Sequence, residues 1–382
     1  MDTILKALAG DDSAQGSAGF PRARSCDTFP AVVSAPSTVR QLNRTFTTRR
    51  TYVMQRLLAL LVTVVALVGL SLTAGAQSKI VIKFAHHAPV TYPYQDGALK
   101  FKEVAEKLSG GKLDVQVFGG AQLGGERDLL EGIKLGTLQM CIGAGGLANF
   151  APAYNIVQLP FLIKNQEHMV KVAEGPAGKL LSQRIEEQGG YKVLGYFSTG
   201  DSGIQTVKGP VRTPADLKGV KIRVMENPAL IESMRALGAN PTPLPFPELY
   251  TSMKQGVVEG ATIDYTALWT TKVYEAVKYV TEPGFHFLAE PRPILISAKF
   301  LASQPADVQQ WITQAGAEAA VYERSLFKDR QGKAIEDLRA KGLQFAKMDD
   351  KAFLEAMRPV WQKVAATYKA EDILVLIIQA GQ

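Results

Sequence analysis

Arg223 is the residue whose type and setting point most directly to chemistry. It lies in the short apolar run 220–224 (VKIRV), flanked by Ile222 and Val224. An arginine on a half-buried strand needs acceptors for its planar fork of N–H donors. Two kinds of acceptor fit: an acid of the protein itself, in an internal salt bridge, or the carboxylate of a ligand, held by two parallel N–H···O bonds.

Three aromatic residues are candidates to cover such a ligand. Phe246 precedes a predicted helix, and Tyr265 and Trp269 follow the strand-like run 257–264. Loops at the ends of strands are where binding residues gather, although large aromatic side chains are also common in cores. These positions permit a binding site beside Arg223 that accepts an apolar moiety, while a core position stays open for each ring.

Patterns typical of enzymes do not occur in the sequence. It has no G-x-S-x-G elbow, no G-x-x-x-x-G-K-[ST] loop, no G-x-G-x-x-G and no H-E-x-x-H. His86 and His87 are adjacent at a predicted strand end, so their side chains point to opposite faces and cannot readily share one metal. The sequence predicts a protein that is not an enzyme and has no metal site and no cofactor.

The basic charge of the chain is concentrated at its N-terminus. The formal charge is +7, but residues 57–72 are an uncharged apolar run, preceded by arginines and followed by Ala74-Gly75-Ala76. This order is typical of a cleavable secretory signal peptide, here 54–76, and the run is shorter than the ~20 residues of a membrane span. Without residues 1–76 the balance is 35 basic against 32 acidic residues, so charge no longer indicates a nucleic-acid partner.

Residues 1–53 precede the predicted signal and show neither helix nor strand periodicity. Two explanations stay open: Met54 is the true start, or Thr48-Arg49-Arg50 belongs to a twin-arginine signal. We expect 1–53 to be disordered or not translated. Either route leads out of the cytoplasm, so the expected location is the periplasm. After cleavage only Cys141 remains of the two cysteines, and its apolar neighbours predict a core position.

The region 77–382 alternates between strand-like and helical patterns, which indicates an α/β architecture. The expected strands are 80–85, 113–118, 139–144, 192–197, 220–224 and 257–264. The expected helices are 96–108, 126–135, 167–188, 228–237, 247–255, 272–280, 306–341 with a break near Gln331-Gly332, and 350–368. Two βα modules followed by a long helix predict two lobes, and a cleft between lobes is a favoured ligand site.

Several motifs along this region carry a resemblance to a known family. They are 122–124 (QLG), 136–138 (GTL), 159–162 (LPFL), 216–224 (DLKGVKIRV), 237–243 (LGANPTP), 248–250 (ELY) and 256–260 (GVVEG). In these motifs and their spacing, the chain resembles the extracytoplasmic solute-binding proteins of tripartite ATP-independent periplasmic (TRAP) transporters, the DctP family. The similarity covers essentially all of 77–382.

The resemblance implies a two-lobed, periplasmic-binding-protein-like α/β fold with an interlobe cleft and a long connecting helix. Lobe I is expected at 77–200 and 289–328, and lobe II at 201–288 and 329–382. The implied function is to capture a small organic acid by closure of the cleft and to deliver it to the membrane permease of a TRAP transporter.

The resemblance also carries site residues over to this chain. In the family, an arginine at the position of Arg223 holds the ligand carboxylate, which agrees with the argument from the residues alone. Four more residues align with pocket positions of the family: His87, Glu126, Glu226 and Phe246. They are the ligand-binding residues that the resemblance implies.

The sequence departs from the family pattern at two places. Residues 201–205 (DSGIQ) stand where many members carry a second arginine, and Ile263 stands at the position of a frequent pocket asparagine. Two other functions stay open: a receptor for an amino acid or other zwitterion, with Glu226 or Asp264 binding the ammonium group, and a periplasmic sensor subunit. C4-dicarboxylates, sugar acids, aromatic acids and 2-oxo acids all fit the pattern as ligands.

Overall fold

The computed structural model describes residues 54, 56, 58, 60, 79–284 and 287–382. The segment Gln77–Gln382 forms one compact unit. The predicted leader at 1–53 and most of the predicted signal peptide at 54–76 lie outside the described residues. Within the described ranges, no helix is both long enough and apolar enough to cross a membrane.

A first sheet has five strands, which are β1 (Ile80–Ala85), β2 (Leu113–Phe118), β3 (Met140–Ile142), β4 (Tyr191–Phe197) and β10 (Arg292–Ser297). Their order is β2-β1-β3-β10-β4. β1 pairs parallel with β2 and β3, whereas β10 runs antiparallel to β3 and β4. Ile82 and Phe84 of β1 are fully buried while Val81 is 40% exposed, as expected of a strand with one face on the core.

A second sheet has six strands, which are β5 (Ser202–Thr206), β6 (Lys221–Val224), β7 (Asn240–Pro243), β8 (Gly260–Asp264), β9 (Tyr279–Thr281) and β11 (Gln344–Ala346). Their order is β11-β9-β5-β8-β6-β7. β6 pairs parallel with β7 and β8, and β5 runs antiparallel to β8 and β9. The two sheets with their helices confirm the predicted α/β class.

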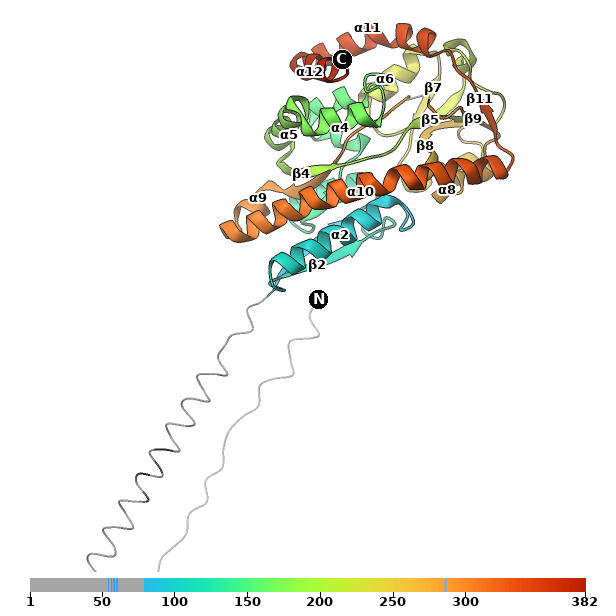
Figure 1. Ribbon diagram of the computed structural model, residues 1–382. Helices are drawn as coiled ribbons and strands as arrows, with labels where there is room; N and C mark the ends of the chain where they lie inside the picture. Colours follow the sequence, from blue (N-terminus) through green and yellow to red (C-terminus); the bar gives the residue numbers. More distant parts are fainter. Residues whose placement is uncertain (1–53, 55, 57, 59, 61–78, 285–286) are drawn as a thin grey trace, which may run out of the picture. The chain divides into compact units, whose positions relative to one another are not determined.

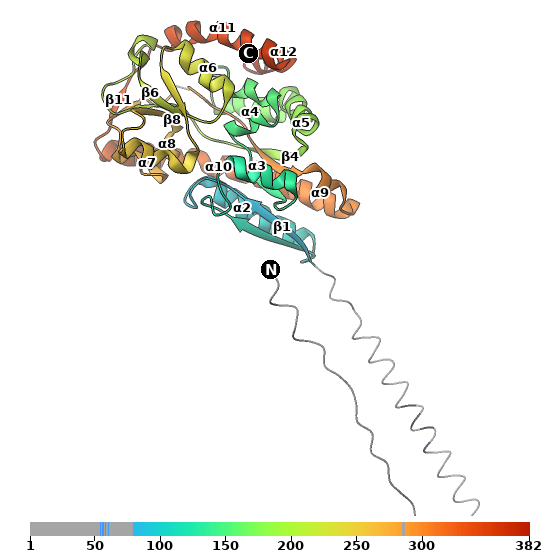
Figure 2. The ribbon, with the colours of Figure 1, turned by 180° about the vertical axis from the view of Figure 1, so that it is seen from behind.

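Helices cover both sheets (Figures 1 and 2). They are α2 (Pro93–Leu108), α3 (Glu126–Leu135), α4 (Gln166–Glu174), α5 (Pro176–Gly189), α6 (Pro228–Ala236), α7 (Leu249–Lys254), α8 (Tyr265–Thr270), α9 (Ala298–Ala302), α10 (Ala306–Ala340), α11 (Asp350–Tyr368) and α12 (Glu371–Ala380). Short 3₁₀ segments lie at Gly145–Asn149, Pro152–Gln158, Pro214–Leu217, Phe246–Glu248 and Val273–Glu275.

The helix α10 is the long connecting element. It runs alongside α2 (Figure 1) and packs against β4 of the first sheet and against α8, the helix that follows β8 of the second sheet. Gly316 allows this close approach, because a Cβ there would lie 2.4 Å from the Cβ of Leu194. The predicted break near Gln331-Gly332 is wrong, since one exposed helical glycine costs only about 1 kcal/mol and the buried residues Phe327 and Ala334 continue the helix on either side.

The chain ends on α11 and α12, which pack across elements from different parts of the sequence. α11 contacts α6 and the segment Pro152–Gln158, and α12 contacts α4 and α5. Trp361 of α11 donates its indole N–H to the carbonyl oxygen of Pro160 at 2.9 Å. The C-terminal helices are therefore integral to the packed unit.

Some predicted elements differ from the structure. The predicted helix 272–280 is wrong: Val273–Glu275 is a 3₁₀ turn and β9 follows, pairing with β5 through Val280 opposite Gln205. The predicted helix 167–188 is divided at Gly175-Pro176 into α4 and α5. No prediction was made for β5, β7, β10, β11, α8, α9 and α12. Apart from α12, these elements span only three to six residues, which is too few to show a clear periodicity.

Candidate functional site

A cavity lies between the two sheets, at the C-terminal ends of the parallel strands β1, β6 and β8. The empty space along its lining amounts to about 670 Å³, including space that is open to solvent. Crevices at the carboxyl ends of strands are the usual ligand sites of open α/β sheets. The lining residues are His87, Ala88, Tyr92, Tyr94, Glu126, Ala144, Ser202, Arg223, Met225, Glu226, Leu244, Pro245, Phe246, Thr262, Ile263, Asp264, Leu288, Glu290 and Arg292.

Arg223 is 2% exposed and lies on β6, between β7 and β8. Its Nε and Nη2 atoms donate to the carbonyl oxygen of Leu244, at 3.1 and 2.9 Å. Among the described residues, no acid lies within ion-pair distance of its guanidinium. Burial, together with the positive charge of Arg292, lowers the pKa of Arg223 to about 10. The carboxylates of Glu226 and Glu126 oppose this lowering, but neither forms an ion pair with the guanidinium. A buried cation without a paired counter-charge is costly, so this wall of the cavity favours an anion.

Aromatic rings stand beside the Arg223 guanidinium. Its carbon lies 5.7 Å from the ring centroid of Phe246, and the ring of His87 meets Phe246 edge-on at 5.9 Å. His87 is the second residue after β1. Burial, with Arg292 as the next cause, lowers the pKa of His87 to about 3. It is thus a neutral imidazole at neutral pH. Its Nδ1 atom is buried and has no hydrogen-bond partner among the described residues.

Glu126 lines the cavity as the first residue of α3, but its acceptors are occupied. Its carboxylate accepts backbone N–H groups of Ala144 at 2.5 Å, Gly146 at 3.0 Å and Leu147 at 3.0 Å. Burial raises the pKa of Glu126, and Arg292 and these donors oppose that rise. The side chain therefore fixes the loop after β3 at the edge of the cavity.

Asp264 ends β8 and joins the two sides of the cavity. Its Oδ1 accepts the backbone N–H of Ala267 at 2.8 Å and caps α8, while its Oδ2 accepts the hydroxyl of Tyr92 at 3.0 Å. Burial raises the pKa of Asp264 to about 7. Glu226 also lines the cavity, and its backbone carbonyl accepts the side-chain amide of Asn149 at 2.6 Å.

Tyr265 and Trp269 do not line this cavity. The Tyr265 hydroxyl donates to the carbonyl oxygens of Thr281 and Glu282, at 3.1 and 3.2 Å, and its side chain is fully buried. Trp269 stacks on Tyr274, with ring centroids 4.9 Å apart. Both rings take structural positions, so six of the eight predicted site residues lie together and these two lie elsewhere.

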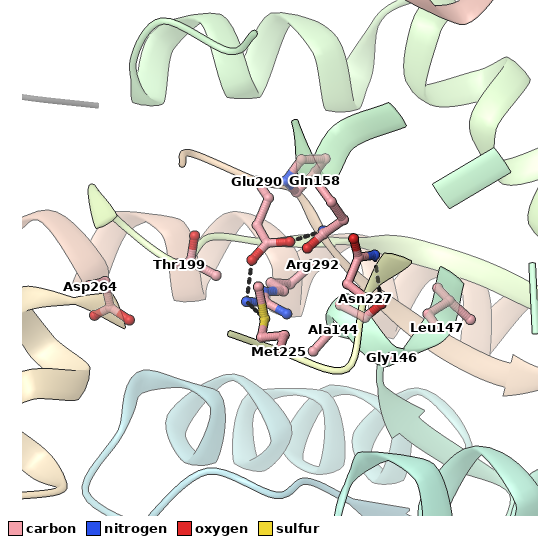
Figure 3. Close-up of polar contacts among 12 residues, drawn as sticks. Ala144, Gly146, Leu147, Gln158, Thr199, Met225, Asn227, Asp264, Glu290 and Arg292 are labelled. Carbon is pink, nitrogen blue, oxygen red and sulfur yellow. Dashed lines mark hydrogen bonds and ion pairs between the residues drawn. The ribbon is translucent and has the colours of Figure 1, made fainter. Parts of the chain in front are cut away.

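A second guanidinium in the cavity has no counterpart in the predictions. Arg292, the first residue of β10, forms an ion pair with Glu290, and Gln158 donates to the same carboxylate (Figure 3). Burial raises the pKa of Glu290 to about 7, and Arg292 opposes that rise. The sequence signal for Arg292 is weaker than that for Arg223: Arg292 stands two residues before the apolar run 294–296 (ILI), with a proline on either side.

The family model for bacterial extracellular solute-binding proteins, family 7 (DctP), matches residues 84–367. The C4-dicarboxylate-binding periplasmic protein DctP of Rhodobacter capsulatus is 32% identical over 84% of this chain and 96% of that protein. The 2,3-diketo-L-gulonate-binding periplasmic protein YiaO of Escherichia coli is 30% identical over 72% of this chain and 84% of that protein.

Solved structures show the same architecture. A TRAP periplasmic solute-binding protein from Bradyrhizobium sp. BTAi1, in complex with galacturonate, matches with a TM-score of 0.75 and 31% identity, over 78% of this chain and all of that one. One from Roseobacter denitrificans with bound β-D-glucuronate matches with a TM-score of 0.75 and 28% identity, over 78% of this chain and 99% of that one. The two-lobed fold expected from the sequence is confirmed.

Proposed function

Because this chain belongs to the bacterial extracellular solute-binding proteins of family 7, the DctP family of TRAP solute-binding proteins, we propose that it captures a small organic acid in the cavity around Arg223 and delivers it to a TRAP membrane permease. The family consists of solute-binding proteins of transport systems rather than enzymes. We further propose that the chain is exported through the signal peptide at 54–76 and acts in the periplasm.

One observation carries the proposal: Arg223 is a buried guanidinium that lines the cavity with no acid of the described residues within ion-pair distance. A ligand carboxylate would supply the missing negative charge and accept hydrogen bonds from the guanidinium. Hydrogen bonds between charged groups are stronger than those between neutral groups. Phe246 and His87 would cover the bound acid on one side. Glu126 and Asp264 would act by holding the cavity walls in place, since protein donors already occupy their oxygens.

Closure of two lobes accounts for how the acid is retained. We assign lobe I to 77–200 and 289–328, and lobe II to 201–288 and 329–382. The distribution of strands between the two sheets supports this division as far as β11, whereas α12 at the C-terminus packs on α4 and α5 of lobe I. The lobes meet around the cavity through the hydrogen bonds Tyr92–Asp264, Asn149–Glu226 and Asn227–Gly145. A ligand that contacts both lobes favours the closed arrangement through its differential affinity.

Isothermal titration calorimetry with acids such as D-galacturonate and D-galactonate tests the proposal. Replacing Arg223 with Gln should weaken binding by about 2–4 kcal/mol, because a charge-assisted contact is lost. Arg223→Lys should also weaken binding, since an ammonium group does not reproduce the planar fork. Arg358→Gln is the matched control, because Arg358 is an exposed arginine on α11. Equal affinity of the Arg223→Gln and Arg358→Gln variants would refute the assigned role.

A further inference from the structure

The Arg292 guanidinium has N–H donors that form no hydrogen bond with the described residues. It is 8% exposed, and its Nη2 lies 3.4 Å from the sulfur of Met225 and contacts the Glu290 carboxylate (Figure 3). Its Nε and Nη1 atoms are buried and have no hydrogen-bond partner among the described residues. A buried N–H group without an acceptor costs about 1–3 kcal/mol. An oxygen atom entering the cavity beside Arg292 would recover that free energy.

The charge of Arg292, unlike its donors, is already satisfied. Glu290 is 1% exposed and holds the guanidinium in an ion pair, while Gln158 donates to the other oxygen of the same carboxylate. Arg223, by contrast, has no acid within ion-pair distance in the described part of the chain. The two arginines therefore favour different ligand groups. Arg223 favours an anion, and Arg292 favours uncharged oxygen atoms that accept hydrogen bonds.

Two further groups on the cavity wall, both uncharged, also lack hydrogen-bond partners among the described residues. The Thr262 hydroxyl and Nδ1 of His87 are buried, line the cavity and lack hydrogen-bond partners in the described ranges. The imidazole is neutral at neutral pH, since burial lowers its pKa to about 3. Each group exchanges hydrogen bonds with hydroxyl or carbonyl groups. They add polar contacts without adding positive charge.

The number of acidic groups on the wall points the same way. Four carboxyl groups line the cavity, those of Glu126, Glu226, Asp264 and Glu290, against the two guanidinium groups. A second carboxylate on the ligand would enter a wall that already holds more acids than bases. Burying a charge without a counter-charge costs several kcal/mol.

We infer that Arg292, neutralised by Glu290, is the specificity-determining residue that binds hydroxyl or carbonyl oxygens, so that the ligand is a singly charged hydroxy or oxo acid rather than a dicarboxylate. This inference rests on the proposed function, because it takes for granted that Arg223 binds one carboxylate. The inference distinguishes between two classes of ligand. C4-dicarboxylates appear in the name of one relative of this chain, and a sugar acid is bound in the solved structure of another.

Matched pairs of acids test the charge preference by calorimetry on the full chain. D-galactonate and galactarate share six carbons and differ by one carboxylate, and L-threonate and L-tartrate are the corresponding four-carbon pair. The monoanion of the better-bound pair should bind at least about tenfold tighter than its dianion, the usual scale for one mismatched polar group. Equal or tighter binding of the dianion would overturn the inference and leave the role of Arg223 intact.

Glu290→Gln tests the mechanism of that preference. Removing the internal counter-charge leaves Arg292 free to bind an anion, so the ratio of monoanion to dianion affinity should fall by about tenfold. The double variant Glu290→Gln/Arg292→Met removes both charges together. It should bind D-galactonate about tenfold more weakly while leaving hexanoate, which has no hydroxyls, within about threefold. Circular dichroism verifies folding, and should either variant fail to fold, the wild-type pairs still decide.

The outcomes separate the two proposals. Binding of acids that Arg223→Gln abolishes, with no preference for the monoanion, would contradict only the role of Arg292. Absence of binding for all four acids and for D-galacturonate would count against the proposed function itself. A folded Glu290→Gln variant with an unchanged affinity ratio would also overturn the role given to Arg292.

Discussion

At the scale of single residues, the site rests on the contrast between two buried arginines. Arg223 could be predicted from sequence because an arginine stood inside an apolar run, and the family resemblance pointed to the same residue. Arg292 was not predicted, because prolines flank it and weaken the strand signal, and because its strand pairs with β3 and β4, which are distant in sequence.

Asp264 gives a prediction about the pH dependence of stability. Burial raises its pKa to about 7 in the folded protein, above the ordinary value of about 4 that the unfolded chain retains. The folded state therefore binds the proton more tightly, and its contribution to stability is present at low pH and lost as pH rises through about 7. Asp264→Asn should reduce the loss of unfolding free energy between about pH 5 and about pH 8 by about 1–3 kcal/mol.

Urea denaturation at the two pH values measures this effect. Asp349→Asn is the matched control, because Asp349 also caps a helix, accepting the N–H of Ala352 at 3.1 Å, but is exposed. Burial also raises the pKa values of Glu290 and Glu126. Part of the pH dependence of stability should therefore remain in both variants. An identical pH profile for Asp264→Asn and the wild type would show that Asp264 does not titrate in this range.

At the scale of elements, the periodicity of apolar residues predicted most helices and several strands. It failed where contacts with other elements determine the local structure. β1, β2, α3 and α11 begin and end at their predicted residues. The predicted break in α10 failed because tertiary packing outweighs one glycine, and the helix predicted at 272–280 failed because pairing with β5 draws 279–281 into a sheet. The spacing of apolar residues contains no information on either tertiary packing or strand pairing.

The contact between α10 and β4 predicts opposite effects for two glycine substitutions in one helix. Gly316→Ala should destabilise the protein by about 1–3 kcal/mol, because the new Cβ would overlap Leu194 in a packed interface. Gly332→Ala should stabilise it by about 0.5–1 kcal/mol, because nothing lies within 4 Å of the new Cβ and alanine is the better helix former. Thermal and urea unfolding measure both, and effects of the same sign would contradict the packing described here.

At the scale of the whole Gln77–Gln382 unit, the two lobes and the cavity act together. The pattern of two βα modules and a long helix predicted two lobes with a cleft between them, and the resemblance to solute-binding proteins predicted the same arrangement. The hydrogen bonds that cross the cavity lie beyond prediction from sequence, because they join residues such as Tyr92 and Asp264 that only the fold brings together.

The Tyr92–Asp264 hydrogen bond predicts a kinetic effect on ligand release. Tyr92→Phe removes a donor that joins the two sides of the cavity, so the closed state should lose about 0.5–1.5 kcal/mol. The dissociation rate of a bound acid should then rise about two- to tenfold. Stopped-flow tryptophan fluorescence measures this rate, with Tyr322→Phe on the exposed side of α10 as the control. An unchanged dissociation rate would mean that this contact does not hold the cavity closed.

The central claim is that the Arg223 guanidinium binds the carboxylate of the ligand. A crystal structure of the protein with D-galactonate, or with whichever acid calorimetry selects, tests it most directly. The account predicts the carboxylate oxygens at about 2.7–2.9 Å from Arg223 nitrogens, with hydroxyl oxygens facing Arg292. A ligand carboxylate bound elsewhere, with Arg223 turned toward an acid of the protein, would contradict it.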